Sequence, residues 1–242
     1  MRYLTFDLTV WDVALIVTVT AQCLLIAYAA SPRWKGLFLS LPFPFTIVAI
    51  SVGRPVDAST VLALFVLLAY TQGVRFLYER WHLPIGLAIV FGVLGYSVIG
   101  WAGAGLVPTG DAAFAVACAI TIPVGFVLRS RHRSEVEQSH RTTLPISLKL
   151  PAIFAVVAFL VSVRHALAGF APLFPLIAVI GAYETRHSLW TLSKPIFTLM
   201  AALPAMLIVT RMTQTTLGLE TGLLLGWIVF LPVLFVLRRN YI

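Results

Sequence analysis

Charged residues are scarce in this sequence. Asp, Glu, Lys and Arg make up only 11% of its 242 residues, whereas an ordinary soluble domain carries about 25%. A soluble fold of this size leaves much of its surface in water and could not hide an apolar content of 60%. The shortage of charge therefore argues against a soluble enzyme, a disordered protein and a nucleic-acid partner, although the formal net charge is +8.

Cysteine and catalytic motifs are scarce as well. The two cysteines, Cys23 and Cys118, both lie in apolar runs, where packing thiols are expected rather than a disulfide. The sequence has no zinc-binding His-Glu helix motif, no glycine-rich phosphate loop and no nucleophile elbow. We therefore expect no metal, no cofactor and no enzyme activity, and an intramembrane enzyme is the weakest of three hypotheses.

Long apolar runs are what the sequence has in abundance. Each is roughly 17–24 residues long, and a helix of about 20 residues crosses the hydrocarbon core of a bilayer. Helices are expected because a backbone in lipid must satisfy its own hydrogen bonds. The nine runs are 11–30, 36–52, 58–78, 83–106, 111–128, 147–166, 168–184, 189–210 and 216–237. They predict an all-α integral membrane protein with nine transmembrane helices, whose main partner is the lipid bilayer.

Lys and Arg are distributed unevenly between the connections of these helices. If the N-terminus is outside and the C-terminus is cytoplasmic, only Arg2, Arg54, Arg164 and Arg211 of the 17 basic residues lie outside. The other 13 basic residues are then cytoplasmic, and cytoplasmic connections typically carry an excess of Lys and Arg. The fifth helix is needed to place the basic stretch 129–143 in the cytoplasm. We expect a multi-pass protein of the plasma (inner) membrane.

The chain contains a candidate internal repeat. A shift of 133 residues aligns Gly36 with Gly169 and Pro42 with Pro175, and it lays the first four helices over the last four. Because five helices separate the starts of the two units, the repeats are predicted to have inverted topology in a 4+1+4 arrangement. The predicted domains are a first four-helix repeat at 1–106, a linker helix with the basic loop at 107–145, and a second four-helix repeat at 146–242.

Two stretches of the second unit resemble the GlpM-like family of small membrane proteins. They are Ala168–Pro175, which reads AGFAPLFP, and Phe197–Pro204, which reads FTLMAALP. The first unit carries the resemblance through Gly36, Pro42 and Leu83-Pro84 alone. Members of that family are single four-helix units, so the chain is similar to two such units fused. The resemblance implies a membrane location and a link to alginate-like exopolysaccharide production, but no reaction.

Prolines interrupt the second and seventh predicted helices, which are also the shortest. A proline removes an amide donor and leaves the carbonyl four residues earlier without its helical partner. Paired interrupted helices in two repeats are a sequence signal for a transporter site, and a simple packing kink is the alternative. The candidate substrate-binding residues are these prolines and polar residues at membrane depth: Gln22, Ser40, Pro42, Pro44, Gln72, Pro172, Pro175, Lys194 and Glu220.

Charges near the helix ends give further expectations. Glu220 is the candidate carboxylate for proton coupling, and its alternative is a helix-end residue favoured by the N-terminal dipole. Lys194 and Glu184 flank one cytoplasmic turn, where they could pair. Three arginines on the outer side would attract an anionic substrate or serve as separate interfacial anchors. They are Arg54, Arg164 and Arg211.

Two function hypotheses follow from these patterns. The first is a transporter or translocator of a small anionic metabolite or a lipid-linked envelope precursor. The second is an accessory membrane subunit without transport activity, which assembles into a polysaccharide-synthesis complex or as a homodimer. The transporter requires a polar cavity among Pro42, Pro44, Pro172 and Pro175, whereas the accessory subunit requires a solidly packed interior and an exposed groove.

Overall fold

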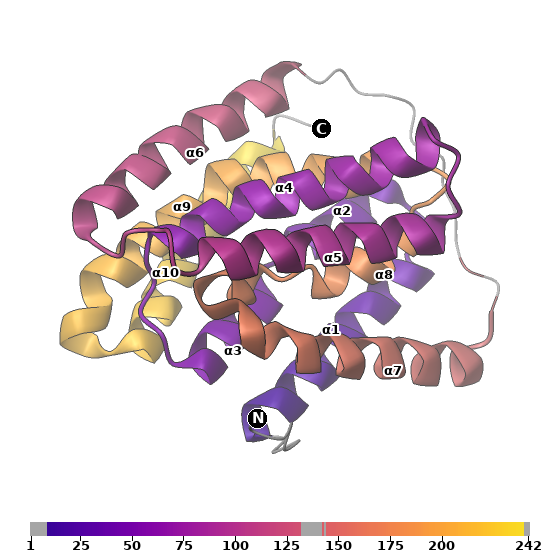
Figure 1. The fold of residues 1–242 in the computed structure, drawn as a ribbon, viewed down its shortest axis with the longest axis horizontal. Coiled ribbons are helices and arrows are strands. Elements are labelled where there is room, and N and C mark those ends of the chain that lie inside the picture. Colours follow the sequence, from indigo (N-terminus) through magenta and orange to yellow (C-terminus); the bar gives the residue numbers. More distant parts are fainter. Residues whose placement is uncertain (1–8, 132–141, 143, 240–242) are drawn as a thin grey trace.

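The computed structural model describes residues 9–131, 142 and 144–239, and these residues form helices without a strand. Figure 1 shows the helices packed side by side, with α4, α5 and α7 along its horizontal axis. In chain order they are α1 Val10–Tyr28, α2 Pro32–Ser40, α3 Phe43–Val52, α4 Ala58–Glu79, α5 Ile85–Gly103, α6 Asp111–Arg131, α7 Ile146–Arg164, the 3-10 helix η1 His165–Leu173, α8 Leu176–Glu184, α9 Trp190–Leu217 and α10 Leu219–Arg239.

The helices match the nine predicted apolar runs. Within the described residues, seven helical stretches are long and apolar enough to cross a membrane, with α2 and α3 forming one of them, so the chain is a multi-pass membrane protein. The two other runs give the shorter apolar helices Ile146–Ser162 and Gly169–Glu184. Two helix boundaries differ from the predicted runs by more than three residues. Helix α2 starts at Pro32 rather than at residue 36, because proline suits the first turn of a helix, and α9 continues to Leu217.

Local sequence explains several of the helix ends. Thr9 and Asp12 form a capping box at the start of α1, in which each side chain accepts a backbone hydrogen bond. Asp57 caps α4 by accepting from the amides of Ser59 and Thr60. Helix α3 ends at Gly53, whose φ of 63° lies in the left-handed region that favours glycine. The capping residues thus separate α3 from α4 at a short, well-defined connection.

Alternate connections of the chain meet at one end of the molecule, which we call the basic end. Three contacts join them there: the Tyr28 hydroxyl donates to the Leu144 carbonyl, Arg75 lies over the ring of Trp190, and Arg238 donates to the Arg33 carbonyl. Two of the remaining connections meet at the opposite end, where Arg211 of α9 binds the residues just before α4 and α6. The helices therefore pass back and forth between two ends.

Two pairs of corresponding helices lie antiparallel. The end of α1 meets the chain just before α7, because the Thr142 amide donates to the Ala27 carbonyl at 3.4 Å. The end of α4 meets the start of α9 at the Arg75–Trp190 contact, and Arg211 near the end of α9 binds Val56 just before α4. The first helix of one predicted unit thus packs antiparallel to the first helix of the other unit, and the two third helices pack in the same way.

Helix α6, the predicted linker helix, runs from one end of the molecule to the other. Asp111 at its start pairs with Arg211 at the opposite end, and Arg129 near its finish donates to the Leu237 carbonyl toward the basic end. It packs along α4 and α9. Its length and apolar composition are those of a membrane span, as the sequence predicted.

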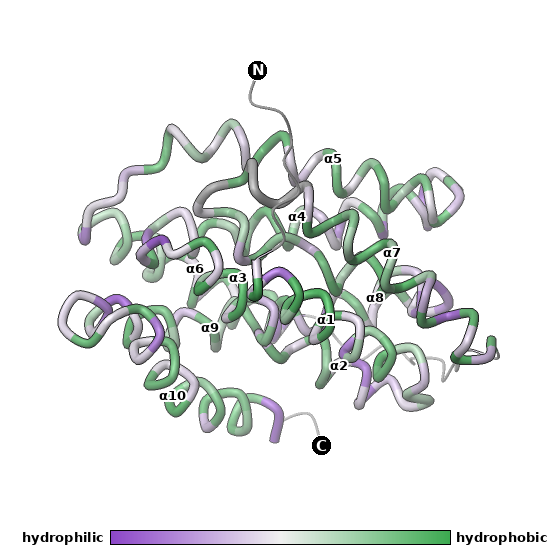
Figure 2. Tube along the Cα trace, turned by 90° about the horizontal axis from the view of Figure 1, so that it is seen from below, coloured by the Kyte–Doolittle hydropathy of each residue, from purple (hydrophilic) through white to green (hydrophobic). Residues whose placement is uncertain are grey.

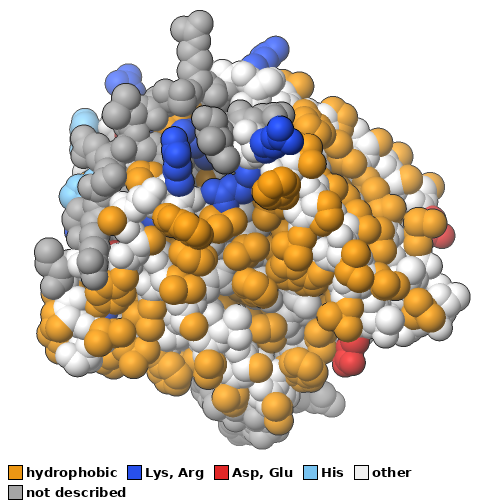
Figure 3. Space-filling model, turned by 180° about the vertical axis from the view of Figure 1, so that it is seen from behind, with side chains coloured by type: hydrophobic (Ala, Val, Ile, Leu, Met, Phe, Trp, Pro, Cys, Tyr) orange, Lys and Arg blue, Asp and Glu red, His pale blue; other side chains and the backbone are white. Residues whose placement is uncertain are grey.

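The outer surface of the helices is strongly apolar. Figure 2 shows hydrophobic residues through the middle of the helices and hydrophilic ones near their ends. Figure 3 shows one face covered mostly by hydrophobic side chains, with Lys and Arg toward its upper edge. Large side chains such as Trp101, Ile228 and Phe235 are 67–71% exposed, and a soluble protein would not leave so many in water. Lipid is the environment that fits this surface.

Candidate functional site

The two helix interruptions have similar backbone angles at the proline that ends each break, although α2 is an α-helix and η1 a 3-10 helix. Helix α3 follows Pro42, whose φ and ψ are −84° and 41°, and α8 follows Pro175, whose φ and ψ are −73° and 45°. A shift of 133 residues carries α2 onto η1, and it carries α3 onto α8 to within one residue. The predicted breaks are therefore confirmed, and they lie at corresponding places in the two halves of the chain.

Side chains from other helices satisfy the carbonyls at the breaks. Gln22 of α1 donates through Nε2 to the carbonyls of Phe38, at 2.5 Å, and Leu41, at 3.2 Å. Pro42 is the residue that deprives the Phe38 carbonyl of its helical donor. At the second break the Tyr96 hydroxyl of α5, which is fully enclosed, donates to the Phe170 carbonyl at 2.9 Å. Each break therefore receives a side-chain donor from another helix, which suits a backbone inside a bilayer.

The four prolines of the predicted site line a single cavity between the two interrupted helices. Pro42 and Pro44 enter it from the first break, and Pro172 and Pro175 from the second. Its volume is about 70 Å³, room for roughly two water molecules, each of which takes about 30 Å³ of the liquid. All of the lining side chains are apolar, including Leu67 of α4. The cavity differs in this respect from the expected polar one.

The backbone of η1 lies very close to the start of α4, and this contact fixes the position of the second break. A Cβ on Gly169 would lie 1.8 Å from the Ser59 Oγ, which itself hydrogen-bonds Asp57 at the start of α4. Only a glycine lets η1 lie this close to α4. The aligned Gly36 is less constrained, because a Cβ there would have Pro195 Cγ as its nearest neighbour, at 3.7 Å.

Three buried ionisable side chains lie together about one helical turn inside the basic end. Lys35 of α2, Lys149 of α7 and Glu184 of α8 are 3%, 6% and 2% exposed. Lys149 Nζ and Glu184 Oε1 form an ion pair at 2.7 Å, and Lys35 Nζ donates to the backbone carbonyl of Glu184 at 3.4 Å. We call these residues the charged cluster. Ionisable residues inside a membrane protein are costly to bury and typically mark functional sites.

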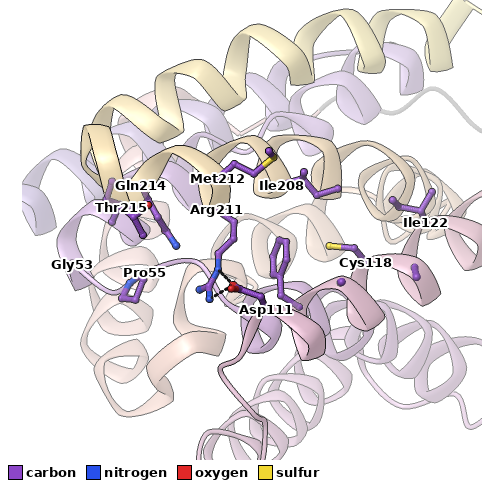
Figure 4. Close-up of a pocket in the computed structure, with 14 residues that line it drawn as sticks. Gly53, Pro55, Asp111, Cys118, Ile122, Ile208, Arg211, Met212, Gln214 and Thr215 are labelled. Atoms are coloured by element: carbon purple, nitrogen blue, oxygen red, sulfur yellow. Dashed lines mark hydrogen bonds and ion pairs between the residues drawn. The ribbon is translucent and has the colours of Figure 1, made fainter.

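A larger cavity, of about 1030 Å³, opens at the end opposite the basic end. Figure 4 shows Arg211 reaching across it to Asp111, with Gln214 to one side and Cys118 to the other. The Arg211 guanidinium binds Asp111 at 2.7 Å and also donates to the carbonyls of Val56 and Thr109. Arg211 therefore ties two connections together, and its charge is balanced by a carboxylate rather than held free for an anion.

The other predicted site residues lie outside the central cavity. The Ser40 hydroxyl donates to the Gly36 carbonyl, and Lys194 lies partly buried in the first turns of α9. Gln72 Nε2 is buried on α4 without a hydrogen-bond partner in the described residues. Glu220 is exposed in the first turn of α10. Arg54 is exposed beside a small pocket near Gly169, and the side chain of Arg164 lies outside the described residues.

Sequence reasoning missed two of the residues that matter most here. Lys35 follows Arg33 and Trp34, so it resembles an interfacial anchor at a helix end, although its side chain is buried. Tyr96 lies in a run of apolar residues and small glycines without any polar neighbour except Ser97. A tyrosine in the middle of an apolar run was the available signal, because a buried hydroxyl usually finds a partner.

No family model, curated protein or solved structure matches this chain. The resemblance to the GlpM-like family therefore stays a prediction, and the functional argument depends on the geometry alone. Within the described residues, no group of three or more His, Cys, Asp or Glu side chains is arranged to hold a metal ion.

Proposed function

We propose that this protein is a translocator for a small anion, built from two four-helix units of inverted topology on either side of α6. The observation that carries the proposal is the meeting of the two interrupted helices, α2–α3 and η1–α8, around one cavity lined by prolines from both. In secondary transporters, substrate sites lie where interrupted helices of two repeats face each other near the middle of the bilayer.

The correspondence of helix boundaries supports the repeat. A shift of 133 residues carries α4 and α5 onto α9 and α10 with differences of one to five residues at their ends. The packing partners correspond as well, because α2 lies against α9 as η1 lies against α4. The antiparallel pairs α1–α7 and α4–α9 are what an inverted repeat requires, since a repeat of the same orientation would make each pair parallel.

Alternation between two states follows from this arrangement. The 70 Å³ cavity is too small for a metabolite, so this conformation is one in which the path is closed at its centre. Inverted units of similar structure can exchange their conformations, which opens the path first toward one side and then toward the other. In the proposed orientation the nine helical stretches all cross the plasma membrane, the N-terminus lies outside, and the basic end faces the cytoplasm.

The charge of the path favours an anion. Near the basic end the charged cluster contributes two ammonium groups against one carboxylate. A buried positive excess attracts a negative cargo and repels a cation. The cargo classes we propose are a small anionic metabolite or a lipid-linked envelope precursor with an anionic group.

Charge movement in reconstituted liposomes tests the proposal without a labelled cargo. Purified protein on a solid-supported membrane would receive rapid jumps of acetate, phosphate or glucuronate. We expect a transient current for at least one of these anions and its loss in the double variant Pro42→Ala/Pro175→Ala, which restores an amide donor directly before α3 and α8 and so alters both breaks. Pro232→Ala, at an exposed proline of α10, should retain the current. The absence of current for every anion in wild-type protein would contradict translocation.

The packed interior favours a second candidate, an accessory subunit without transport activity. The central cavity is small and apolar, and a much larger space opens at one end of the molecule, as expected for a scaffold. Under this alternative the Pro42→Ala/Pro175→Ala protein would be as functional as wild type wherever it remains folded. The two candidates therefore differ in the current and in its sensitivity to the breaks.

A further inference from the structure

The charged cluster has no counterpart at the aligned positions of the other predicted unit. The residues that a shift of 133 aligns with Lys35, Lys149 and Glu184 are Ala168, Ile16 and Ser51, none of which carries a charge. The cluster therefore exists at the basic end alone. A feature that costs several kcal/mol per buried ion and has no counterpart in the other unit calls for a reason of its own.

The charged cluster has a net charge of +1, because it contains two lysines and one glutamate. Lys149 and Glu184 neutralise each other in a close ion pair, with side chains 7% and 2% exposed. Lys35 then remains as a buried ammonium without a carboxylate of its own in the described residues. An ammonium has three donors, and Lys35 uses one of them in a long hydrogen bond to the Glu184 backbone carbonyl. One monovalent anion would balance the charge and occupy the remaining donors.

Glu184 adds a second requirement to the ligand. Its Oε1 accepts from Lys149, whereas its Oε2 is buried and has no hydrogen-bond partner among the described residues. A buried carboxylate oxygen needs a donor, because leaving it unsatisfied costs more than the bond itself contributes. A simple halide would offer no donor and would repel this oxygen. An anion that keeps one O–H group would donate to it while accepting from Lys35.

We propose that Lys35, Lys149 and Glu184 form a binding site for a small monovalent oxyanion that carries one proton, of the bicarbonate or dihydrogen phosphate class. The Lys35 ammonium donates to an oxygen of the anion, and the anion's O–H donates to Glu184 Oε2. Lys149 holds the other carboxylate oxygen and so orients Glu184. The inference rests on the proposed function for the view that the bound anion is cargo, whereas binding itself needs no transport.

Bicarbonate and nitrate are a matched pair of ligands for the test. Both are small, flat and monovalent, and only bicarbonate carries an O–H group. Thermal unfolding of the detergent-purified protein, followed by tryptophan fluorescence, would give the affinity of each anion at constant ionic strength with gluconate as the balancing salt. We expect bicarbonate to bind at least about tenfold more tightly than nitrate, because one hydrogen bond to a charged group contributes about 1.5–3 kcal/mol.

Three variants separate the roles. Lys35→Gln should abolish stabilisation by both anions. Glu184→Gln, which removes the carboxylate and leaves two ammonium groups, should bind both anions with equal affinity, and it keeps the test decisive if Lys35→Gln does not fold. Arg80→Gln removes an exposed charge at the same end and should behave as wild type.

Equal affinity of the wild-type protein for bicarbonate and nitrate would overturn the proposal, as would stabilisation that persists in Lys35→Gln. Bicarbonate binding without any anion current would leave the site in place and remove translocation, so the two proposals fail separately.

Discussion

Gln22 and Phe38 are joined by a hydrogen bond from the side-chain amide to the backbone carbonyl that Pro42 leaves without its helical donor. The amide also reaches the Leu41 carbonyl, so that a single side chain of α1 binds two backbone carbonyls at the first break. Gln22 is 5% exposed. The interruption is therefore a supported element of the fold rather than a frayed helix end.

Replacing Gln22 tests this support. Gln22→Leu should lower the free energy of unfolding by about 1–3 kcal/mol, because the Leu41 carbonyl loses the Gln22 donor and the Phe38 carbonyl keeps only the 3.3 Å bond from the Leu41 amide. Gln72→Leu is the matched control. Its Nε2 is already buried without a partner in the described residues, so the same substitution should be neutral or stabilising. Chemical unfolding in mixed micelles measures both variants, and equal losses would refute the role of Gln22.

The close approach at Gly169 leads to a second prediction. Gly169→Ala should destabilise the protein by about 1–3 kcal/mol, because its methyl group would overlap Ser59. Gly36→Ala, at the aligned position, should cost less, since its methyl group would meet Pro195 at an ordinary contact distance. The melting temperatures of the two variants give the comparison.

Relief by a second substitution would confirm the cause. In a Ser59→Ala background the hydroxyl is gone, so Gly169→Ala should lose part of its effect in a double-mutant cycle. Strictly additive effects would show that the Ser59 hydroxyl is not the obstacle.

The buried ion pair gives a third prediction. Lys149→Met leaves the Glu184 carboxylate without its partner, and breaking a buried pair from one side costs about 3–5 kcal/mol. The double variant Lys149→Met/Glu184→Met should recover most of that loss, because the buried carboxylate is removed together with its partner. Glu79→Gln breaks the partly exposed Arg75–Glu79 pair and should cost less than about 1 kcal/mol. Unfolding free energies in micelles are the measurement.

We expect Arg211 to stabilise the protein more through its hydrogen bonds to backbone carbonyls than through its ion pair with Asp111. Asp111→Asn should change stability by less than about 1 kcal/mol, because the Asp111 side chain is 90% exposed. Arg211→Met should cost more, since the carbonyls of Val56 and Thr109 lose their donor. Proteolysis of the 104–110 connection should become faster in Arg211→Met alone, whereas equal proteolysis rates in the two variants would point to the ion pair.

The sequence was sufficient to predict where the helices lie and where two of them break. Hydropathy depends on local composition, and proline acts within four residues of itself, so both signals are readable without tertiary structure. The shared 133-residue spacing was readable for the same reason. The sequence did not reveal which side chains donate hydrogen bonds to the backbone carbonyls at each break.

Those groups come from distant parts of the chain. Tyr96 lies 74 residues before the carbonyl that it satisfies, and Lys149 lies 35 residues before Glu184. The sequence favours Lys194 as the partner of Glu184, because it follows in the next helix, but the close pair is with Lys149. Pairings of this kind depend on how helices pack, and apolar helices of similar composition do not reveal their neighbours. The burial of Lys35 could not be predicted either, because it also depends on how the helices pack.

The central claim is that α6 crosses the bilayer, because this crossing inverts the second unit relative to the first. Single cysteines at Gly110→Cys and Ser130→Cys mark its two ends, and wild-type protein is the control, since Cys23 and Cys118 are buried. In intact cells a membrane-impermeant maleimide should label Gly110→Cys and not Ser130→Cys, which should react only after permeabilisation. Labelling of both positions from the same side would contradict the inverted arrangement.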